Sequence, residues 1–144
     1  MHQLQLHPYL TFNGNCHEAM TFYQQCLGGE LMIQPFAGTP AAEGLDAAKA
    51  ENTVLHASLK KDDLLLMASD AGMQPVGKGD MVSLSLQCGS EEEITRLFAQ
   101  LSADGTVIMP LEDAFWGDTF GMFTDRFGID WMLSYNKATA EKPA

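Results

Sequence analysis

An internal repeat with an offset of 75 residues limits the possible folds of this chain more than any other feature of its sequence. Gly14 matches Gly89 and Pro35 matches Pro110, and each pair is 75 positions apart. Between these positions both halves follow the same order of helix start, apolar helical stripe, helix stop and short strand. Because two unrelated segments would not agree in all four features, we interpret the chain as two copies of one structural unit.

Each copy is predicted to contain one long helix. Asn15 and Ser90 are the expected N-cap residues, and Glu18 and Glu93 follow three positions later, as in a capping box. Apolar residues then recur at the spacing that places one face of a helix in a core. These residues are Ala19, Phe22, Tyr23 and Cys26 in the first copy, and Ile94, Leu97, Phe98 and Leu101 in the second.

The remaining apolar segments predict strands. Each predicted helix lies between two of them, residues 4–12 and 31–35 in the first half and residues 81–87 and 106–110 in the second. Two further pairs, 53–60 with 63–69 and 118–125 with 129–135, complete the halves, and residues 37–51 read as an irregular loop or weak helix. We therefore predict an α+β fold within a single domain, residues 1–144. It consists of two tandem βαβββ modules, residues 4–70 and 81–136, with a linker at 71–80.

Charge and composition exclude several classes of protein. Nineteen Asp and Glu residues against eight Lys and Arg give a net charge of −11, which disfavours binding to nucleic acids and to anionic membranes. No apolar run is long enough to cross a bilayer, and the first ten residues lack the features of a secretory signal. We expect a cytoplasmic protein that acts on a small molecule.

The three cysteines show no CxxC spacing and predict neither a disulfide framework nor a zinc knuckle. Cys16 is expected in the first turn of a helix, where the helix dipole could lower the pKa of its thiol. The alternative is a small buried apolar residue.

Three stretches resemble the vicinal oxygen chelate superfamily, which includes glyoxalase I, bleomycin-resistance proteins and extradiol dioxygenases. They are HPYLTFNGNCHEAMTFYQQCLGGEL at 7–31, HASLKKDDLLLMASD at 56–70 and FWGDTFGMFTDRFGIDWML at 115–133, and together they are most similar to the PhnB-like branch. The resemblance implies that the two modules form a curved mixed sheet around one cavity. It also implies a homodimer in which modules of both chains can contribute to each cavity.

The resemblance further implies positions for a divalent metal, one on the first and one on the last strand of each module. They fall on His7, Met67, Met81 and Met132. Because such metals need carboxylate or imidazole ligands at most of these places, we predict no cofactor, with a divalent metal held by His7 as the alternative. Judged only by the softness of their donor atoms, one histidine and three methionines would suit Cu(I). Methionines, however, more often fill gaps in apolar pockets.

His7 and His56 are the candidate catalytic residues. An imidazole in the cavity can act as a general base or donate a hydrogen bond to a ligand carbonyl; alternatively, it pairs with a neighbour and only shapes the pocket. Trp116 is expected at the pocket mouth, where a flat ligand could stack on it. The predicted substrate-binding residues are Tyr9, Met67, Met81, Ser83, Trp116 and Met132.

Three functions remain open at this point. The first is the binding of a small, hydrophobic or aromatic metabolite in the cavity. The second is a metal-dependent lyase, isomerase or dioxygenase of the glyoxalase type. The third is a non-catalytic protein that sequesters a drug, as bleomycin-resistance relatives do. Methionines at the implied metal positions favour binding, whereas the two histidines keep an enzyme possible.

Overall fold

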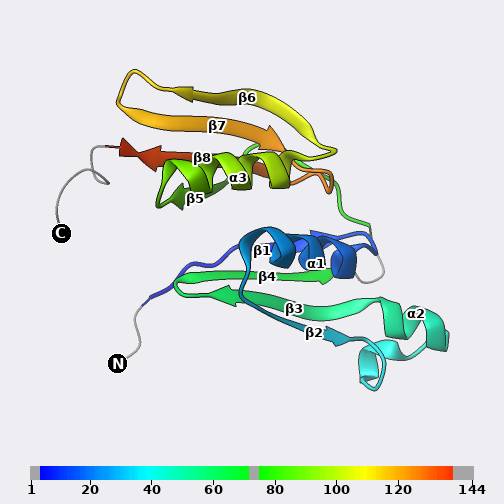
Figure 1. Ribbon diagram of the computed structural model, residues 1–144. Coiled ribbons are helices and arrows are strands. Elements are labelled where there is room, and N and C mark those ends of the chain that lie inside the picture. Colours follow the sequence, from blue (N-terminus) through cyan, green and yellow to red (C-terminus); the bar gives the residue numbers. More distant parts are fainter. Residues whose placement is uncertain (1–3, 72–74, 138–144) are drawn as a thin grey trace. The chain divides into compact units, whose positions relative to one another are not determined.

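The computed structural model describes residues 4–71 and 75–137, and the chain divides into two compact units, Met1–Gly77 and Lys78–Ala144. Each unit contains a four-stranded sheet and one long helix (Figure 1). The first unit contains β1 (Tyr9–Phe12), α1 (Cys16–Leu27), β2 (Glu30–Pro35), η1 (Pro40–Ala42), α2 (Ala47–Asn52), β3 (Val54–Lys61) and β4 (Leu64–Asp70). The second contains β5 (Leu84–Cys88), α3 (Glu91–Ser102), β6 (Thr106–Asp113), β7 (Asp118–Thr124) and β8 (Asp130–Asn136).

The two sheets have the same topology. The strand order is β1-β4-β3-β2 in the first and β5-β8-β7-β6 in the second. In each, the first and last strands of the unit pair in parallel and the other neighbours pair antiparallel. The predicted α+β fold of two tandem βαβββ modules is therefore confirmed.

The core of each unit lies between its long helix and one face of its sheet. In the first unit α1 buries Ala19, Met20 and Tyr23. In the second, the ring of Phe98 on α3 meets Phe123 of β7 edge to face at 5.1 Å between centroids. The predicted apolar stripes thus face the sheets, with Phe22 the one member that is only half-buried.

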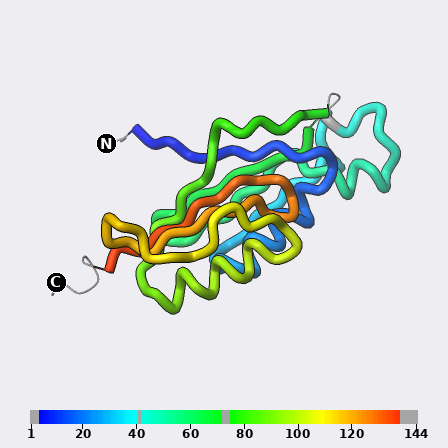
Figure 2. The backbone as a smooth tube through the Cα atoms, turned by 90° about the horizontal axis from the view of Figure 1, so that it is seen from above, coloured from blue at the N-terminus to red at the C-terminus, as the bar shows by residue number. Residues whose placement is uncertain are grey.

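The units differ between the second and third strands. In the first unit this connection carries η1 and the short helix α2, which project beyond the end of the sheet (Figure 2). Asp46 caps α2, because its side chain accepts a hydrogen bond from the Lys49 backbone N–H at 2.7 Å. In the second unit β6 and β7 are joined directly by a turn.

The first strand of each unit is shorter than predicted. β1 begins at Tyr9 rather than at residue 4, because Pro8 has no N–H to donate to the ladder, although its carbonyl still accepts from Met67 N at 3.2 Å. β5 begins at Leu84 rather than at residue 81. Its partner strand β8 begins at Asp130, so residues 81 and 82 have no opposite residue on that strand.

One of the two predicted capping boxes is wrong. Ser90 accepts from the Glu93 backbone N–H at 3.0 Å, and the Glu93 side chain reaches back to Gly89 N at 2.9 Å. Asn15, however, makes no side-chain cap to α1. Asp70 replaces it: its Oδ1 accepts from the backbone N–H groups of Gly14 and Cys16, each at 2.9 Å. The end of β4 lies beside the start of α1, so this carboxylate takes the position of the cap.

Candidate functional site

Each sheet has one face covered by a helix and one open face. In the first unit the covered face carries Ala57, Leu59, Leu66 and Ala68, all of them buried. Alternate residues of a strand point to opposite faces, and the other set defines what we call the first open face. It carries Tyr9 and Thr11 of β1, His56, Ser58 and Lys60 of β3, and Met67 and Ser69 of β4.

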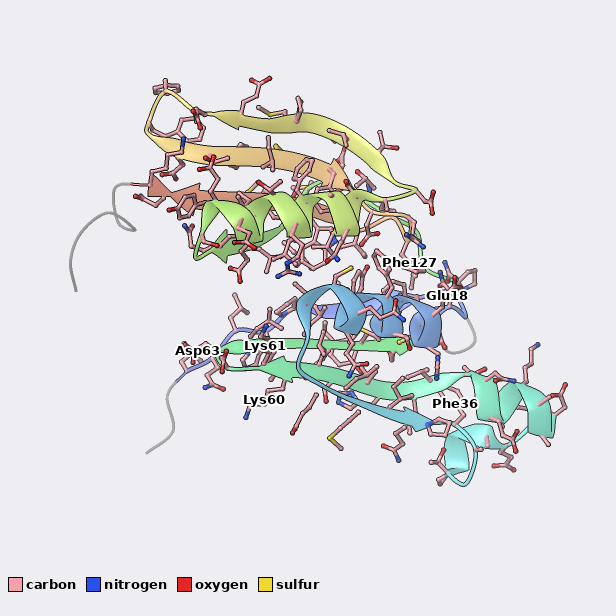
Figure 3. All side chains as sticks on the ribbon, in the orientation of Figure 1. Glu18, Phe36, Lys60, Lys61, Asp63 and Phe127 are labelled. Atoms are coloured by element: carbon pink, nitrogen blue, oxygen red, sulfur yellow. The ribbon has the colours of Figure 1, made fainter. Side chains whose placement is uncertain are left out.

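The last two residues of β3 show the two faces directly. Lys61 Nζ donates to the carbonyl of Leu27 at the C-terminal end of α1 at 2.9 Å, so its side chain lies on the covered side. Lys60 points to the other side of the sheet (Figure 3). It places an exposed cation at one end of the first open face.

A hydrogen bond between Tyr9 and His56 is the main polar feature of this face. Tyr9 Oη lies 3.1 Å from His56 Nδ1, and the ring centroids are 5.8 Å apart. The bond spans β4, which lies between β1 and β3. Met67 of β4 is the register partner of both Tyr9 and Ser58. The structure therefore brings together three of the predicted site residues: Tyr9, His56 and Met67.

The Tyr9–His56 pair can donate a proton and can also accept one. When Tyr9 donates to Nδ1, the neutral imidazole carries its proton on Nε2 and can donate it to a ligand oxygen. When Nδ1–H donates to the Tyr9 oxygen, Nε2 is an acceptor and can take a proton from a ligand. Within the described part of the chain, the hydrogen bond to Tyr9 is the only interaction of the His56 side chain besides their ring contact. Among these residues, His56 Nε2 makes no hydrogen bond that a ligand would have to replace.

Within the described residues, His7 makes no hydrogen bond to this pair. It precedes β1, and its ring Nε2 is 3.2 Å from Gln5 Oε1. Its predicted catalytic role and its role as a metal ligand both remain predictions. Across residues 4–71 and 75–137, no three His, Cys, Asp or Glu side chains are grouped so that they could hold a metal ion.

The donors at the metal positions implied by the family do not fit a divalent ion. Met67 and Met132 present neutral, soft thioethers, and each lies on a sheet face in a different unit. Met81 lies before β5 and is 96% exposed. Mg²⁺, Mn²⁺ and Zn²⁺ favour oxygen or imidazole ligands over thioethers. We therefore assign no reaction step to a divalent metal.

The second open face is rich in sulfur and aromatic side chains. It carries Met132 of β8, Met122 and Phe120 of β7, and Met109 of β6. Trp116, 54% exposed in the turn before β7, meets Phe120 at 5.7 Å between ring centroids. Of the residues predicted here, Met132 lies on this face and Trp116 contacts Phe120 at its margin, whereas Met81 and Ser83 precede β5.

Sequence reasoning missed Met109 and Met122 as members of this face. The alternation of β7 indicates that Met122 shares a face with Phe120. The placement of Met109 depends on two register shifts in β6, which no local pattern shows.

All three cysteines are buried, and the pKa values of Cys16 and Cys88 are raised rather than lowered. Burial, together with the nearby Asp70 carboxylate, raises the pKa of the Cys16 thiol to about 12. The pKa is raised rather than lowered at this helix end, mainly because the thiol is buried and additionally because Asp70 brings a negative charge to it. Of the two interpretations of Cys16, the small buried residue therefore holds. Burial also raises the pKa of Cys88 to about 11, with Glu93 adding to the shift and Arg96 opposing it. Neither thiol is a candidate nucleophile.

The fold agrees with the comparisons to known proteins. A family model described as Glyoxalase/Bleomycin resistance protein/Dioxygenase superfamily matches residues 5–133. The chain belongs to this superfamily. In the described ranges, no helix has both the length and the apolar character needed to span a bilayer.

Individual relatives cover nearly the whole chain. Protein YjdN of Escherichia coli (strain K12) is 33% identical over 93% of this chain and 97% of its own length. The crystal structure of protein PA1353 from Pseudomonas aeruginosa is 43% identical, covers 93% of this chain and 98% of that one, and has a TM-score of 0.81. A PhnB protein from Bacillus cereus is 27% identical, with coverages of 92% and 99% and a TM-score of 0.75. These likenesses confirm the PhnB-like character indicated by the sequence.

Proposed function

We propose that this protein binds a small, hydrophobic or aromatic metabolite carrying a carbonyl or hydroxyl group, and that the ligand contacts the first open face. The observation that carries the proposal is the hydrogen bond of 3.1 Å between Tyr9 and His56. This pair supplies one hydrogen-bond donor and one acceptor at the surface. Neither group takes part in a helix cap or in the backbone hydrogen bonds between strands.

The surroundings of the pair suit a ligand that is mostly apolar. Met67 lies directly beside Tyr9, and Met32 of β2 is 71% exposed and pairs with Ser58. Methionine side chains adapt to irregular apolar shapes and make favourable contacts with aromatic rings. The hydroxyls of Ser58, Ser69 and Thr11 add short polar contacts. Small-molecule sites commonly combine such apolar surface with a few oriented polar groups.

If the bound metabolite reacts, the pair can carry out proton transfer. His56 Nε2 takes the proton from the ligand while Nδ1–H donates to the Tyr9 oxygen, and the reverse transfer returns the proton to another ligand atom. This sequence is an isomerisation, and its atoms balance without an added reactant.

A second candidate is non-catalytic binding of the same class of ligand. The observation that favours it is the chemistry of Met67 and Met132, which stand where the family resemblance implies metal ligands. Without a Lewis acid at those positions, binding requires only the shape and polarity of the surface.

The test is a thermal-shift screen with aromatic and carbonyl-bearing metabolites, followed by calorimetry on each hit. Replacing His56 by Ala is expected to weaken binding about tenfold, the effect of one lost hydrogen bond of about 1.4 kcal/mol. Tyr9→Phe is expected to weaken it less. His17→Ala, at an exposed position on α1, is the matched control and is expected to leave affinity unchanged.

The outcomes separate the two candidates. Loss of turnover in His56→Ala at saturating ligand supports proton transfer, whereas loss of affinity without any turnover in the unmodified protein supports binding alone. Unchanged affinity and turnover in His56→Ala would overturn the placement of the site.

A further inference from the structure

A row of three methionines crosses the second sheet. Met109 on β6 is the register partner of Met122 on β7, and Met122 is the register partner of Met132 on β8. These three strands are neighbours in the sheet (Figure 1). Because register partners point to the same face of a sheet, the three thioethers lie side by side on the second open face. We call these three residues the methionine row.

The three sulfur atoms can converge on one point. Two strand spacings separate the outer members, so their backbones are about 9.5 Å apart. Each methionine side chain is unbranched and has three rotatable bonds. The thioethers of Met109 and Met132 can therefore swing inward over Met122, which lies between them.

The methionine row is not part of the hydrophobic core. The core of this unit lies on the opposite face, where Phe123 and Trp131 are 1% and 2% exposed. Met109 is 47% exposed, and Met122 and Met132 are half-buried. Strand positions of this kind favour β-branched and aromatic residues, so packing alone gives little reason for three methionines in one line.

The three donors of the row are soft and uncharged. Glu112, the register partner of Phe120, is a carboxylate on the same face but is not a member of the row. The register partner beyond Met132 is Ser85, so the row itself contains no carboxylate or imidazole. Asp130, two residues before Met132 on the same strand, is occupied by hydrogen bonds from Thr124 at 2.6 Å and from Lys78 at 3.1 Å. Thioether ligands select Cu(I), whereas hard divalent ions need oxygen donors.

We infer that the methionine row is a binding site for one soft monovalent metal ion, Cu(I), with Ag(I) as its redox-stable analogue. Because the three thioethers are neutral, they do not neutralise the ion, and the bound complex keeps a charge of +1. The net charge of −11 on the protein favours the approach of such a cation. The site does not involve the Tyr9–His56 pair, which lies in the other unit. The result of testing this inference is therefore independent of the result of testing the proposed function.

The experiment is a titration of the full chain, labelled at its methionine methyl groups, with Ag(I). Of the nine methionines, three methyl resonances are expected to shift together and to saturate at one equivalent. The single variants Met109→Leu, Met122→Leu and Met132→Leu assign these signals. Cu(I) affinity is measured without oxygen by competition with bicinchoninate.

The central variant gives the sharpest result. Met122→Leu keeps the size of the side chain but removes the middle donor, and Cu(I) binding is expected to weaken at least about tenfold. Met32→Leu, at an exposed methionine on the first sheet, is the matched control and is expected to leave affinity unchanged. Met109→Leu, on the exposed edge strand, gives the same test if Met122→Leu fails to fold.

Two results would overturn the inference. One is the absence of stoichiometric binding by the unmodified protein. The other is binding that leaves the three methyl signals unmoved while lowering the reactivity of the thiols, which would assign the ion to Cys16, Cys26 or Cys88 instead.

Discussion

The two units begin their long helices with the same sequence pattern but cap them in different ways. In the second unit Ser90 and Glu93 form the cap from within the helix itself. In the first, Asn15 occupies the equivalent place without capping, and Asp70 supplies the acceptor from the end of β4. A local pattern therefore predicts where a helix begins, but a neighbouring strand can determine which side chain satisfies its first N–H groups.

Each unit also buries one aspartate, and the two serve different purposes. Asp70 is 4% exposed and joins the start of α1 to the start of β3, because its Oδ2 also accepts from Val54 N at 2.8 Å. Asp125 is 3% exposed and holds the turn between β7 and β8 by accepting from Phe127 N and Ile129 N. It also accepts from the indole N–H of Trp131 at 2.8 Å. Asp70 links separate elements, whereas Asp125 organises a local turn.

The open faces differ in chemistry as well. The first presents an imidazole, a phenol and hydroxyl groups around Met67, while the second presents three thioethers and aromatic rings. The shared fold thus supports two surfaces that suit different ligands, because outward-facing strand residues vary without disturbing the core behind them.

The largest expected effect comes from removing Asp70. Asp70→Ala leaves three backbone N–H groups without their acceptor, at about 1–3 kcal/mol for each buried group. It also removes a negative charge from a helix N-terminus. We expect the free energy of unfolding to fall by about 4 kcal/mol in urea titrations. Asp125→Ala, whose acceptor role is more local, is expected to cost about 3 kcal/mol. A loss below about 1 kcal/mol for Asp70→Ala would contradict its role as the link between elements.

The next largest losses of stability are expected from replacing a glycine in the turn that follows each long helix. A Cβ on Gly29 would lie 2.5 Å from the Lys60 carbonyl oxygen, and its φ of +97° is unfavourable for other residues. A Cβ on Gly105 would overlap the Thr124 carbonyl oxygen, although the φ of Gly105 is not in the positive range that disfavours other residues. We expect Gly29→Ala to cost about 3 kcal/mol and Gly105→Ala about 2 kcal/mol. Thermal unfolding checks the ranking, and Gly79→Ala, where the space is open, is the control.

A smaller effect separates the two N-caps. Ser90→Ala removes a hydrogen bond to Glu93 N and is expected to cost about 1 kcal/mol. Asn15→Ala removes no cap and is expected to change stability by less than about 0.5 kcal/mol. Urea titrations of both variants provide the measurement. Equal losses would show that Asn15 contributes to the helix start after all.

The smallest expected effect near neutral pH is the contribution of the Cys16 and Cys88 thiols to the pH dependence of the free energy of unfolding. Their pKa values are raised in the folded state to about 12 and about 11, from an ordinary value of 9.0. The unfolded chain therefore loses these protons first, so their contribution to stability is complete below pH 9 and declines as the pH rises above it. Urea titrations between pH 8 and pH 10.5 should show this decline, and Cys16→Ala should reduce it more than Cys88→Ala. Rapid labelling of either thiol in the folded protein at pH 8 would contradict it.

The sequence predicted the repeat, both long helices and all eight strands, with errors mainly at strand ends. These features follow from apolar periodicity and turn residues, which act over a few positions. The cap by Asp70, the Tyr9–His56 hydrogen bond and the methionine row were not predicted. Each depends on residues from different elements of the fold.

The sequence by itself determined the two-module architecture and the superfamily of this protein, because helix and strand patterns are written in neighbouring residues. Only the tertiary structure decided which carboxylate caps α1, which phenol hydrogen-bonds to His56 and which methionines are register partners on adjacent strands. Those outcomes depend on strand register. Register is set by the packing of whole sheets against their helices, and a shift of one residue turns every side chain of a strand to the other face.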